Sequence, residues 1–255
     1  MRLFFVLLLI GVCSWADVRY LLRCEVESSD KMMSKSGALQ AAMKDCTSEI
    51  LQTKEKQLSR NGKVSQILDF KTETTITLDH EKKTWSKGTA SVGEKAAQAQ
   101  MEQLKSMGAQ FKMVSNPITE TKKIAGYEAK GLAGLLQMTF NFPGMDKGMS
   151  SRAVMEFWVS ETAPGAAEVL QATSGQQSPT LRLMAQFLTT VPGGSQMLKD
   201  GANLRGQLME MTMKMETAGL ADTLSLAMLM RAENFVVGPI EASEFEVPAD
   251  YKEVK

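Results

Sequence analysis

Methionine side chains are the most distinctive chemical feature of this sequence. Methionine recurs at every second position from 209 to 215, and leucine and methionine recur in the same way from 224 to 230. Thioethers are soft ligands that suit Cu(I), and their flexible side chains also repack around apolar molecules of varied shape. These positions are therefore candidates for binding an apolar ligand or a soft metal. They are Met209, Met211, Met213, Met215, Leu224, Leu226, Met228 and Met230.

The sequence leaves three interpretations of these methionines open. Their shared side can be an ordinary core covered by helices, a flexible pocket for a lipid or another apolar ligand, or a Cu(I) site. Same-face neighbours along one strand lie about 6.6 Å apart, so a metal site would need bent rotamers or sulfur atoms from a second strand. Our working hypothesis is a ligand-binding surface with no metal and no cofactor.

The sequence contains no recognisable catalytic signature. His80 is the only histidine and lies in a charged turn, whereas a histidine-based metal site needs several ligands. A Ser-His-Asp triad would depend on this same residue, and no G-x-S-x-G, G-x-G-x-x-G or P-loop motif is present. We therefore predict that the protein is not an enzyme and has no catalytic residues. An uncharacterised envelope hydrolase is the enzymatic alternative.

The first residues have the pattern of a secretory signal peptide. Arg2 precedes the apolar run 3–12, and Ser14-Trp15-Ala16 has the small-x-small pattern of a cleavage site. The run is too short to span a membrane as a stable helix. A lipoprotein signal at Cys13 is the competing interpretation, but the bulky Val12 precedes it. We expect a signal peptide over residues 1–16, cleavage after Ala16, and a periplasmic or secreted protein.

Two cysteines follow the expected cleavage site. Cys24 is in phase with the apolar positions of an alternating segment, and Cys46 shares a helical stripe with Leu39, Ala42 and Met43. Both side chains are therefore expected to point inward. Because export makes disulfide formation permissible, a Cys24–Cys46 bridge can form, and two buried thiols are the alternative.

Charge excludes some classes of partner. The chain has 29 basic and 29 acidic residues, whereas a nucleic-acid-binding protein needs a basic face. No apolar segment after the signal peptide is long enough to span a membrane. We expect no nucleic-acid partner and no transmembrane segment in the mature chain, and no protein partner is identified.

Periodicity predicts many strands and several helices, which are grouped in three parts of the chain. Strands are expected at 17–27, 47–60, 63–70, 72–78, from 84 onward, 111–115, 118–124, 127–132, 135–142 and 152–160, followed by the two methionine-rich segments. Helices are expected near 36–46, 91–108, 164–173, 178–190 and 195–200. Asn61-Gly62 and Ala125-Gly126 are typical of hairpin turns. The predicted fold is one α+β domain, residues 17–255, with a curved antiparallel sheet whose apolar face is covered by helices.

Three short motifs carry a resemblance to a known family. They are Lys123-Ile124-Ala125-Gly126-Tyr127-Glu128, the segment Met155–Ser160, and the tail Glu244–Val254 with its F-x-x-P-x-x-Y pattern. In this order after a secretory signal, they resemble a family of bacterial envelope proteins of unknown function, which is itself similar to the LolA/LolB-like lipoprotein-carrier superfamily. The resemblance covers nearly the whole mature chain.

The resemblance implies a half-open antiparallel barrel with helices on its concave side. It also implies an envelope location and an apolar cavity able to hold an acyl chain, and it carries over no catalytic residues. The expected function is thus a secreted or periplasmic non-catalytic protein that binds a lipid or another apolar ligand. The alternatives are a structural or protein-interaction role with a filled core, Cu(I) binding, and an envelope hydrolase.

Overall fold

The computed structural model describes residues 17–28, 46–89, 99, 102–106, 108–140, 148–167, 188, 191–218 and 224–254. Strands dominate this described part of the chain. They are β1 (Val18–Ser28), β2 (Ser48–Gln52), β3 (Lys56–Asn61), β4 (Val64–Asp69), β5 (Thr74–Asp79), β6 (Thr84–Thr89), β7 (Ala109–Ile124), β8 (Tyr127–Phe140), β9 (Met149–Ser160), β10 (Gln207–Ala218), β11 (Leu224–Val237) and β12 (Lys252–Glu253). The helix α5 (Gly194–Ala202) and the 3-10 helix η2 (Ala242–Phe245) complete the labelled elements.

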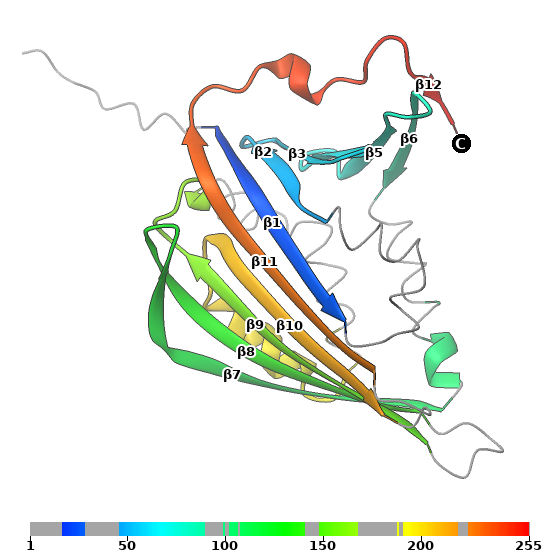
Figure 1. Ribbon diagram of the computed structural model, residues 1–255, viewed down its shortest axis with the longest axis vertical. Helices are drawn as coiled ribbons and strands as arrows, with labels where there is room; N and C mark the ends of the chain where they lie inside the picture. Colours follow the sequence, from blue (N-terminus) through cyan, green and yellow to red (C-terminus); the bar gives the residue numbers. More distant parts are fainter. Residues whose placement is uncertain are drawn as a thin grey trace, which may run out of the picture.

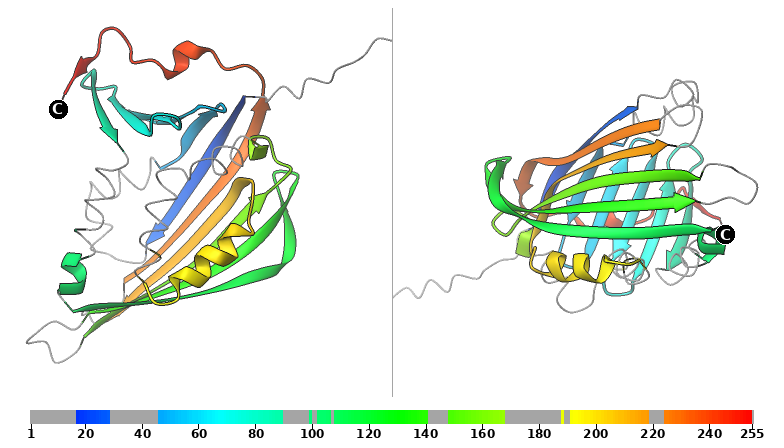
Figure 2. Two further views of the ribbon diagram at one scale, coloured as in Figure 1. Left: turned by 180° about the vertical axis from the view of Figure 1, so that it is seen from behind. Right: turned by 90° about the horizontal axis from the view of Figure 1, so that it is seen from below.

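All of these strands belong to one sheet of 12 strands, in the order β12-β6-β5-β4-β3-β2-β1-β11-β10-β9-β8-β7. Neighbouring strands are antiparallel, except for the parallel pair of β12 and β6. The sheet curves but does not close, because β7 and β12 stand at opposite ends of the order (Figure 2). The predicted curved antiparallel sheet is therefore confirmed, with one parallel pair at its edge.

The strand β1 joins two series of strands that differ in length. On one side, β2 to β6 have 5 or 6 residues each. On the other side, β11 to β7 have 12 to 16 residues each. Figure 1 shows the short strands at one end of the long ones. The methionine-rich segments form β10 and β11, in the middle of the long series.

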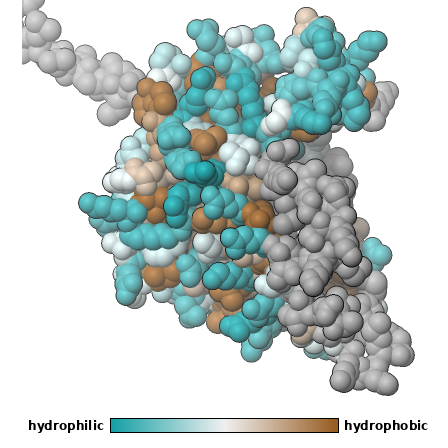
Figure 3. Space-filling model, viewed as in Figure 1, coloured by the Kyte–Doolittle hydropathy of each residue, from teal (hydrophilic) through white to brown (hydrophobic). Residues whose placement is uncertain are grey.

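Two faces of the long strands are distinguished by α5, and we call the face that packs against α5 the inner face. The Ser115 hydroxyl on β7 donates to an Asp200 carboxylate oxygen on α5 at 2.5 Å, and Met197 of α5 packs over Gly134 of β8. The opposite, outer face is turned toward the viewer in Figure 1, where the long strands lie in front of α5. Figure 3 shows that this outer side is mainly hydrophilic, with small separate hydrophobic spots.

Both predicted hairpin turns are confirmed. Ile124 pairs with Tyr127 around Ala125 and Gly126, whose φ angles are 49° and 87°. Positive φ at both central residues matches the twist of the flanking strands, so the turn favours this register. The second hairpin connects β3 and β4 through Gly62 and Lys63, because Asn61 is the last residue of β3 and pairs with Val64; of these residues only Gly62 has a positive φ, of 49°.

The C-terminal tail passes over the short strands and is held there by several kinds of contact (Figure 1). Phe245 of η2 is 6% exposed and packs in a cluster with Leu58 and other residues of β2 to β5. Glu244 forms an ion pair with Arg60 of β3. The parallel pairing of β12 begins where the Lys252 N–H donates to the Lys83 carbonyl oxygen at 3.0 Å.

Several predicted strand boundaries differ from the structure: the strands expected at 127–132 and 135–142 form the single strand β8, and two further differences have a clear cause. Residues 47–60 form two strands, β2 and β3, because the Thr53 hydroxyl accepts the Lys56 N–H at 3.0 Å and stabilises a turn without glycine or proline. Strand β7 continues through Pro117, where an end was expected. The Met113 N–H points away from β8 and donates to the Pro192 carbonyl oxygen. Pro117 is four residues further along this edge strand, at a position where an N–H would also point away from β8. A residue without an N–H is therefore tolerated there.

The predicted helices are only partly described. The helix expected at 195–200 is confirmed as α5, which contacts β7 and β8. The expected helices near 36–46, 91–108, 164–173 and 178–190 lie largely outside the described residues. Within the described residues, α5 covers part of the inner face, and the helical residues Leu104 and Leu188 pack against the same cluster.

Candidate functional site

The methionines of β10 lie between those of two neighbouring strands. Met213 is directly opposite Met155 of β9 on one side and Met228 of β11 on the other. Met211 lies in the next row, opposite Met230 of β11. The predicted ligand-binding residues other than Met209 therefore share one face of two adjacent strands. Further neighbours are Phe157 beside Met211, Ala153 and Leu226 beside Met215, and Thr217 beside Leu224.

Met209 is separated from the other predicted residues by a β-bulge. Leu208 pairs with Val159 and Glu210 pairs with Trp158, so the register of β10 shifts around Met209. Met209 is fully buried, at 0% exposure, in a cluster that includes Trp158 and Ala163. The prediction that Met209 continues the methionine row is wrong, because one extra residue in the strand changes the phase of the side chains.

Exposure divides the inner face into two regions. Beneath and beside α5, Met113 and Leu132 are buried, at 3% and 4% exposure. The methionines of β10 and β11 on this face, including Met213 and Met228, are only half-buried, although their smaller neighbours Ala153 and Thr217 are buried. Side chains in the second region therefore retain contact with solvent, although they belong to the same apolar face.

Gly134 places α5 close to the edge of the methionine rows. It lies opposite Met155, in the same row as Met213. A Cβ at Gly134 would lie 3.0 Å from Met197 Cε and 3.8 Å from Met155 Cε. The missing side chain therefore leaves the space that Met197 fills, and α5 ends its cover of the face beside Met155.

An ion cluster lies on the outer face behind these rows. The Glu210 side chain is 4% exposed, and its carboxylate accepts from Lys122 at 2.5 Å and from Arg231 at 2.6 Å. Burial raises the pKa of the Glu210 carboxyl, but hydrogen bonds and charge from these two cations outweigh burial and lower its pKa overall. The Lys122 ammonium also lies 4.3 Å from the centre of the Trp158 ring. This cluster ties β7, β9, β10 and β11 together.

Cys24 and Cys46 form a disulfide in the structure, with an S–S distance of 2.06 Å. Cys24 is opposite Met230 in register and is 9% exposed. The Thr47 hydroxyl accepts the Cys24 N–H at 3.1 Å and holds the segment after Cys46 beside β1. The bridge therefore joins one edge of the methionine rows to the start of β2, and neither sulfur is a free thiolate.

Both ring nitrogens of His80 have hydrogen-bond partners, although His80 was expected in a solvated turn. Its Nε2 lies 2.7 Å from the Ser65 hydroxyl, and its Nδ1 lies 2.6 Å from the Tyr251 hydroxyl. A serine hydrogen-bonded to a histidine has the composition of an activated nucleophile. Ser65 is only 2% exposed, however, so its hydroxyl does not face a substrate-sized space. These hydrogen bonds join the tail to the β4–β5 hairpin. Sequence periodicity did not indicate this contact.

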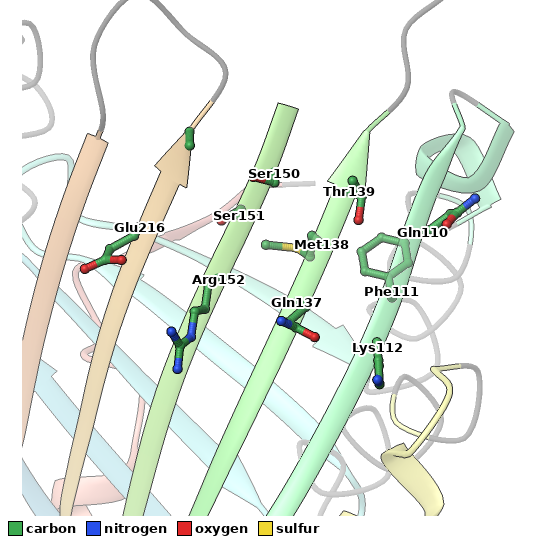
Figure 4. A pocket seen from close by; sticks show the side chains of 11 residues that line it. Gln110, Phe111, Lys112, Gln137, Met138, Thr139, Ser150, Ser151, Arg152 and Glu216 are labelled. Carbon is green, nitrogen blue, oxygen red and sulfur yellow. The ribbon is translucent and has the colours of Figure 1, made fainter. Parts of the chain in front are cut away.

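A polar groove crosses the far end of β7 to β10. Its volume is about 530 Å³, and its exposed charged side chains are Lys112, Arg152 and Glu216. Figure 4 shows these side chains with Gln137 in a row across four strands. Because Glu216 alternates with the methionines of β10, this row lies on the outer face. No sequence motif indicated the groove, since its residues come together only through strand register.

Neither metal-site geometry nor comparison with known proteins assigns an activity. In the described part of the chain, no group of three or more His, Cys, Asp and Glu side chains could hold a metal ion. No family model matches the sequence, and no curated protein matches it. None of the helices described is long and apolar enough to cross a membrane.

Proposed function

We propose that the protein is a non-catalytic periplasmic or secreted protein that holds a lipid or another apolar ligand against its inner face. The observation that carries this proposal is the half-buried surface made by the rows of β10 and β11. A ligand there would contact Met211, Met213 and Met215 of β10 and Leu226, Met228 and Met230 of β11. Met209 is left out of the proposed site, because it is buried in a different cluster.

The composition of these rows favours an apolar ligand of variable shape. Methionine is unbranched and has several rotatable bonds, so neighbouring methionines can repack around chains of different length. Removing apolar surface from water stabilises binding by about 25 cal/mol per Å². Because the rows are half-buried before any ligand is present, a ligand can still remove their remaining exposed area from water.

The remaining features of the proposal concern the fold and location. We propose a half-open barrel in which helices cover part of the concave face and leave room for the ligand, as the resemblance to lipoprotein carriers implies. The sheet's two unpaired ends and the position of α5 beside Met155 support this arrangement. The signal-peptide pattern of residues 1–16 supports export, and an oxidised Cys24–Cys46 pair is compatible with an exported protein.

A non-catalytic role follows from the chemistry of the proposed site. Thioether and hydrocarbon side chains neither accept a proton from a substrate nor donate one near neutral pH. The described strand positions next to Met213, on its own strand face and on β9 and β11, are Met211, Met215, Met155 and Met228. Such a surface binds by burying area and does not stabilise developing charge.

The test compares two glutamate substitutions on the same strand. A fluorescent long-chain fatty acid is titrated into the wild type, Met228→Glu and the control Val236→Glu, whose position on β11 is 61% exposed. Met228→Glu should weaken binding at least about tenfold, because a carboxylate would have to lose its hydration beside the acyl chain. Val236→Glu should bind like the wild type.

Native mass spectrometry of gently purified protein provides a second measurement and should detect a retained lipid. Equal affinity in the two variants would contradict the proposed site. A wild type that carries no lipid and binds no fatty acid would contradict the proposed function, and would favour a structural or protein-interaction role.

A further inference from the structure

We propose that Met155, Met213 and Met228 form a binding site for one Cu(I) ion on the inner face. This inference goes beyond the proposed binding of an apolar ligand, because it assigns a metal-binding role to three particular sulfur atoms. Met213 lies directly opposite Met155 and directly opposite Met228, so the three residues form one row across β9, β10 and β11. All three side chains are half-buried and can be reached from solvent.

The spacing of this row suits a single ion better than the spacing along a strand does. Same-face neighbours on one strand are about 6.6 Å apart, whereas neighbouring strands are about 4.8 Å apart. Directly opposite residues of an antiparallel pair have Cβ atoms about 4.5–5.5 Å apart. Two methionines placed on either side of Met213 can therefore extend their three flexible bonds toward a common point above it.

The residues at the β8 end of the row show where the Met155 side chain lies. Gly134 has no side chain, and Met197 of α5 fills that space, with its Sδ 3.5 Å from the position that a Gly134 Cβ would take. Met197 and Met155 pack in the same cluster. Met155 Cε lies 3.8 Å from the same Gly134 Cβ position, so the Met155 side chain leans toward β8 in this structure, and Cu(I) binding requires its flexible bonds to rotate toward Met213.

The surroundings select a soft ion of low charge. The strand positions that flank the trio on the same face are apolar in the described structure, and they include Phe157, Met211, Met230 and Leu226. Neutral thioethers do not compensate the charge of a hard divalent cation, whereas they are the ligands that Cu(I) prefers. Cys24 lies near the row, but its sulfur is held in the disulfide and supplies no thiolate.

The test is a competition for Cu(I) between the protein and a chromophoric Cu(I) chelator. All samples are the mature chain that begins at Asp17, whose two cysteines form the disulfide, so that no free thiol contributes. Ascorbate under anaerobic conditions keeps copper reduced, and a thiol assay verifies that the disulfide remains. The wild-type background should take up one Cu(I) per chain. The triple variant Met155→Leu, Met213→Leu and Met228→Leu should bind at least about tenfold more weakly, since loss of even an indirect partner of a metal costs about 10–100-fold.

Two controls separate this inference from the proposed function. Met209→Leu removes a thioether that is buried in another cluster, so it should leave Cu(I) affinity unchanged. The triple leucine variant should still bind the fluorescent fatty acid, because leucine keeps most of the apolar volume of methionine. X-ray absorption of the copper-loaded protein should show sulfur atoms as the nearest neighbours of the ion.

Three results would overturn the inference. The first is that the wild-type background does not take Cu(I) from the chelator. The second is that the triple variant and the wild type bind Cu(I) equally, and the third is that nitrogen and oxygen atoms surround the ion. Each result leaves the fatty-acid titration as an independent measure of the apolar-ligand proposal.

Discussion

Met113 and Met213 occupy the same face of the same sheet but have different surroundings. Met113 is 3% exposed in the cluster that includes Met197 of α5, whereas Met213 is half-buried among the strand residues of β9 and β11. The two regions use the same residue type in the same alternating pattern. What differs is the cover supplied by another part of the chain, so an apolar strand face alone does not distinguish a packed core from a binding surface.

Truncating the two methionines should produce the largest difference between the regions. Met113→Ala should lower the free energy of unfolding by about 2–5 kcal/mol, because it removes buried atoms and leaves a cavity. Met213→Ala should cost less than about 1.5 kcal/mol, because the half-buried Met213 side chain is already partly exposed to solvent and folding removes less of its apolar area from water. Denaturant unfolding followed by circular dichroism measures both values. Equal losses would show that the two regions are packed alike.

Glu210, on the outer face of β10, allows the stability of the strand that carries the methionine rows to be tested separately. Its carboxylate stabilises the strand that carries the open rows, and its pKa is lowered in the folded protein below the ordinary 4.5. A lowered folded pKa gives stability that is complete above pH 4.5 and is lost as the pH falls through the folded pKa. Glu210→Gln should cost about 1–3 kcal/mol at neutral pH, as the loss of hydrogen bonds to charged groups does.

The acid dependence of Glu210→Gln provides the check on that assignment. The stability difference between the wild type and the variant should shrink as the pH falls below 4.5, and chemical unfolding at a series of pH values measures it. Asp69, Asp79 and Asp250 also have lowered pKa values, so both proteins should lose some stability in acid. A difference that stays constant down to the acid limit would mean that Glu210 titrates normally.

Tyr20 marks a closed end of the inner face and should give the smallest effect. It is 5% exposed and packs with Val18, Ile50 and Ala232, and burial raises its pKa to about 12. A raised folded pKa contributes stability below pH 10 that is lost as the pH rises toward 12. Tyr20→Phe should cost about 0.5–1.5 kcal/mol at neutral pH, because it removes the hydroxyl that forms hydrogen bonds with the Gln207 and Gln57 side chains.

Alkaline titration separates Tyr20 from the other tyrosines. The phenolate absorbance that is present in the wild type and missing in Tyr20→Phe should develop only near pH 12. If that absorbance developed near pH 10 in the folded protein, the end of the face between β1 and β2 would be open to water as well.

Local patterns predicted the parts of the fold that depend on local chemistry. The period-two methionines indicated the paired strands β10 and β11, and Ala125-Gly126 indicated a hairpin because both residues take positive φ there. The helix at 195–200 was also predicted from its sequence and is α5. In each case the deciding interactions lie within a few residues of one another.

Features that depend on distant partners were not predictable from one sequence. The bulge at Met209 changes the phase of β10 without any change in its apolar pattern, and Pro117 is tolerated only because β7 is an edge strand. The tail is held by Tyr251 on His80, 171 residues away in sequence. The polar groove around Arg152 likewise exists only once four strands are in register. Such features need the topology as well as the pattern.

Oxidation of individual methionines tests the central claim, that one region of the inner face is open and the other is covered. Dilute hydrogen peroxide converts accessible methionines to sulfoxides, and peptide mass spectrometry measures the rate at each position. Met213 and Met228 should oxidise clearly faster than Met113 and Met209 in the folded protein, and all four should react alike after unfolding. If Met213 and Met228 were protected in the folded protein as strongly as Met113, the rows of β10 and β11 would be a filled core, and the proposed binding surface would be wrong.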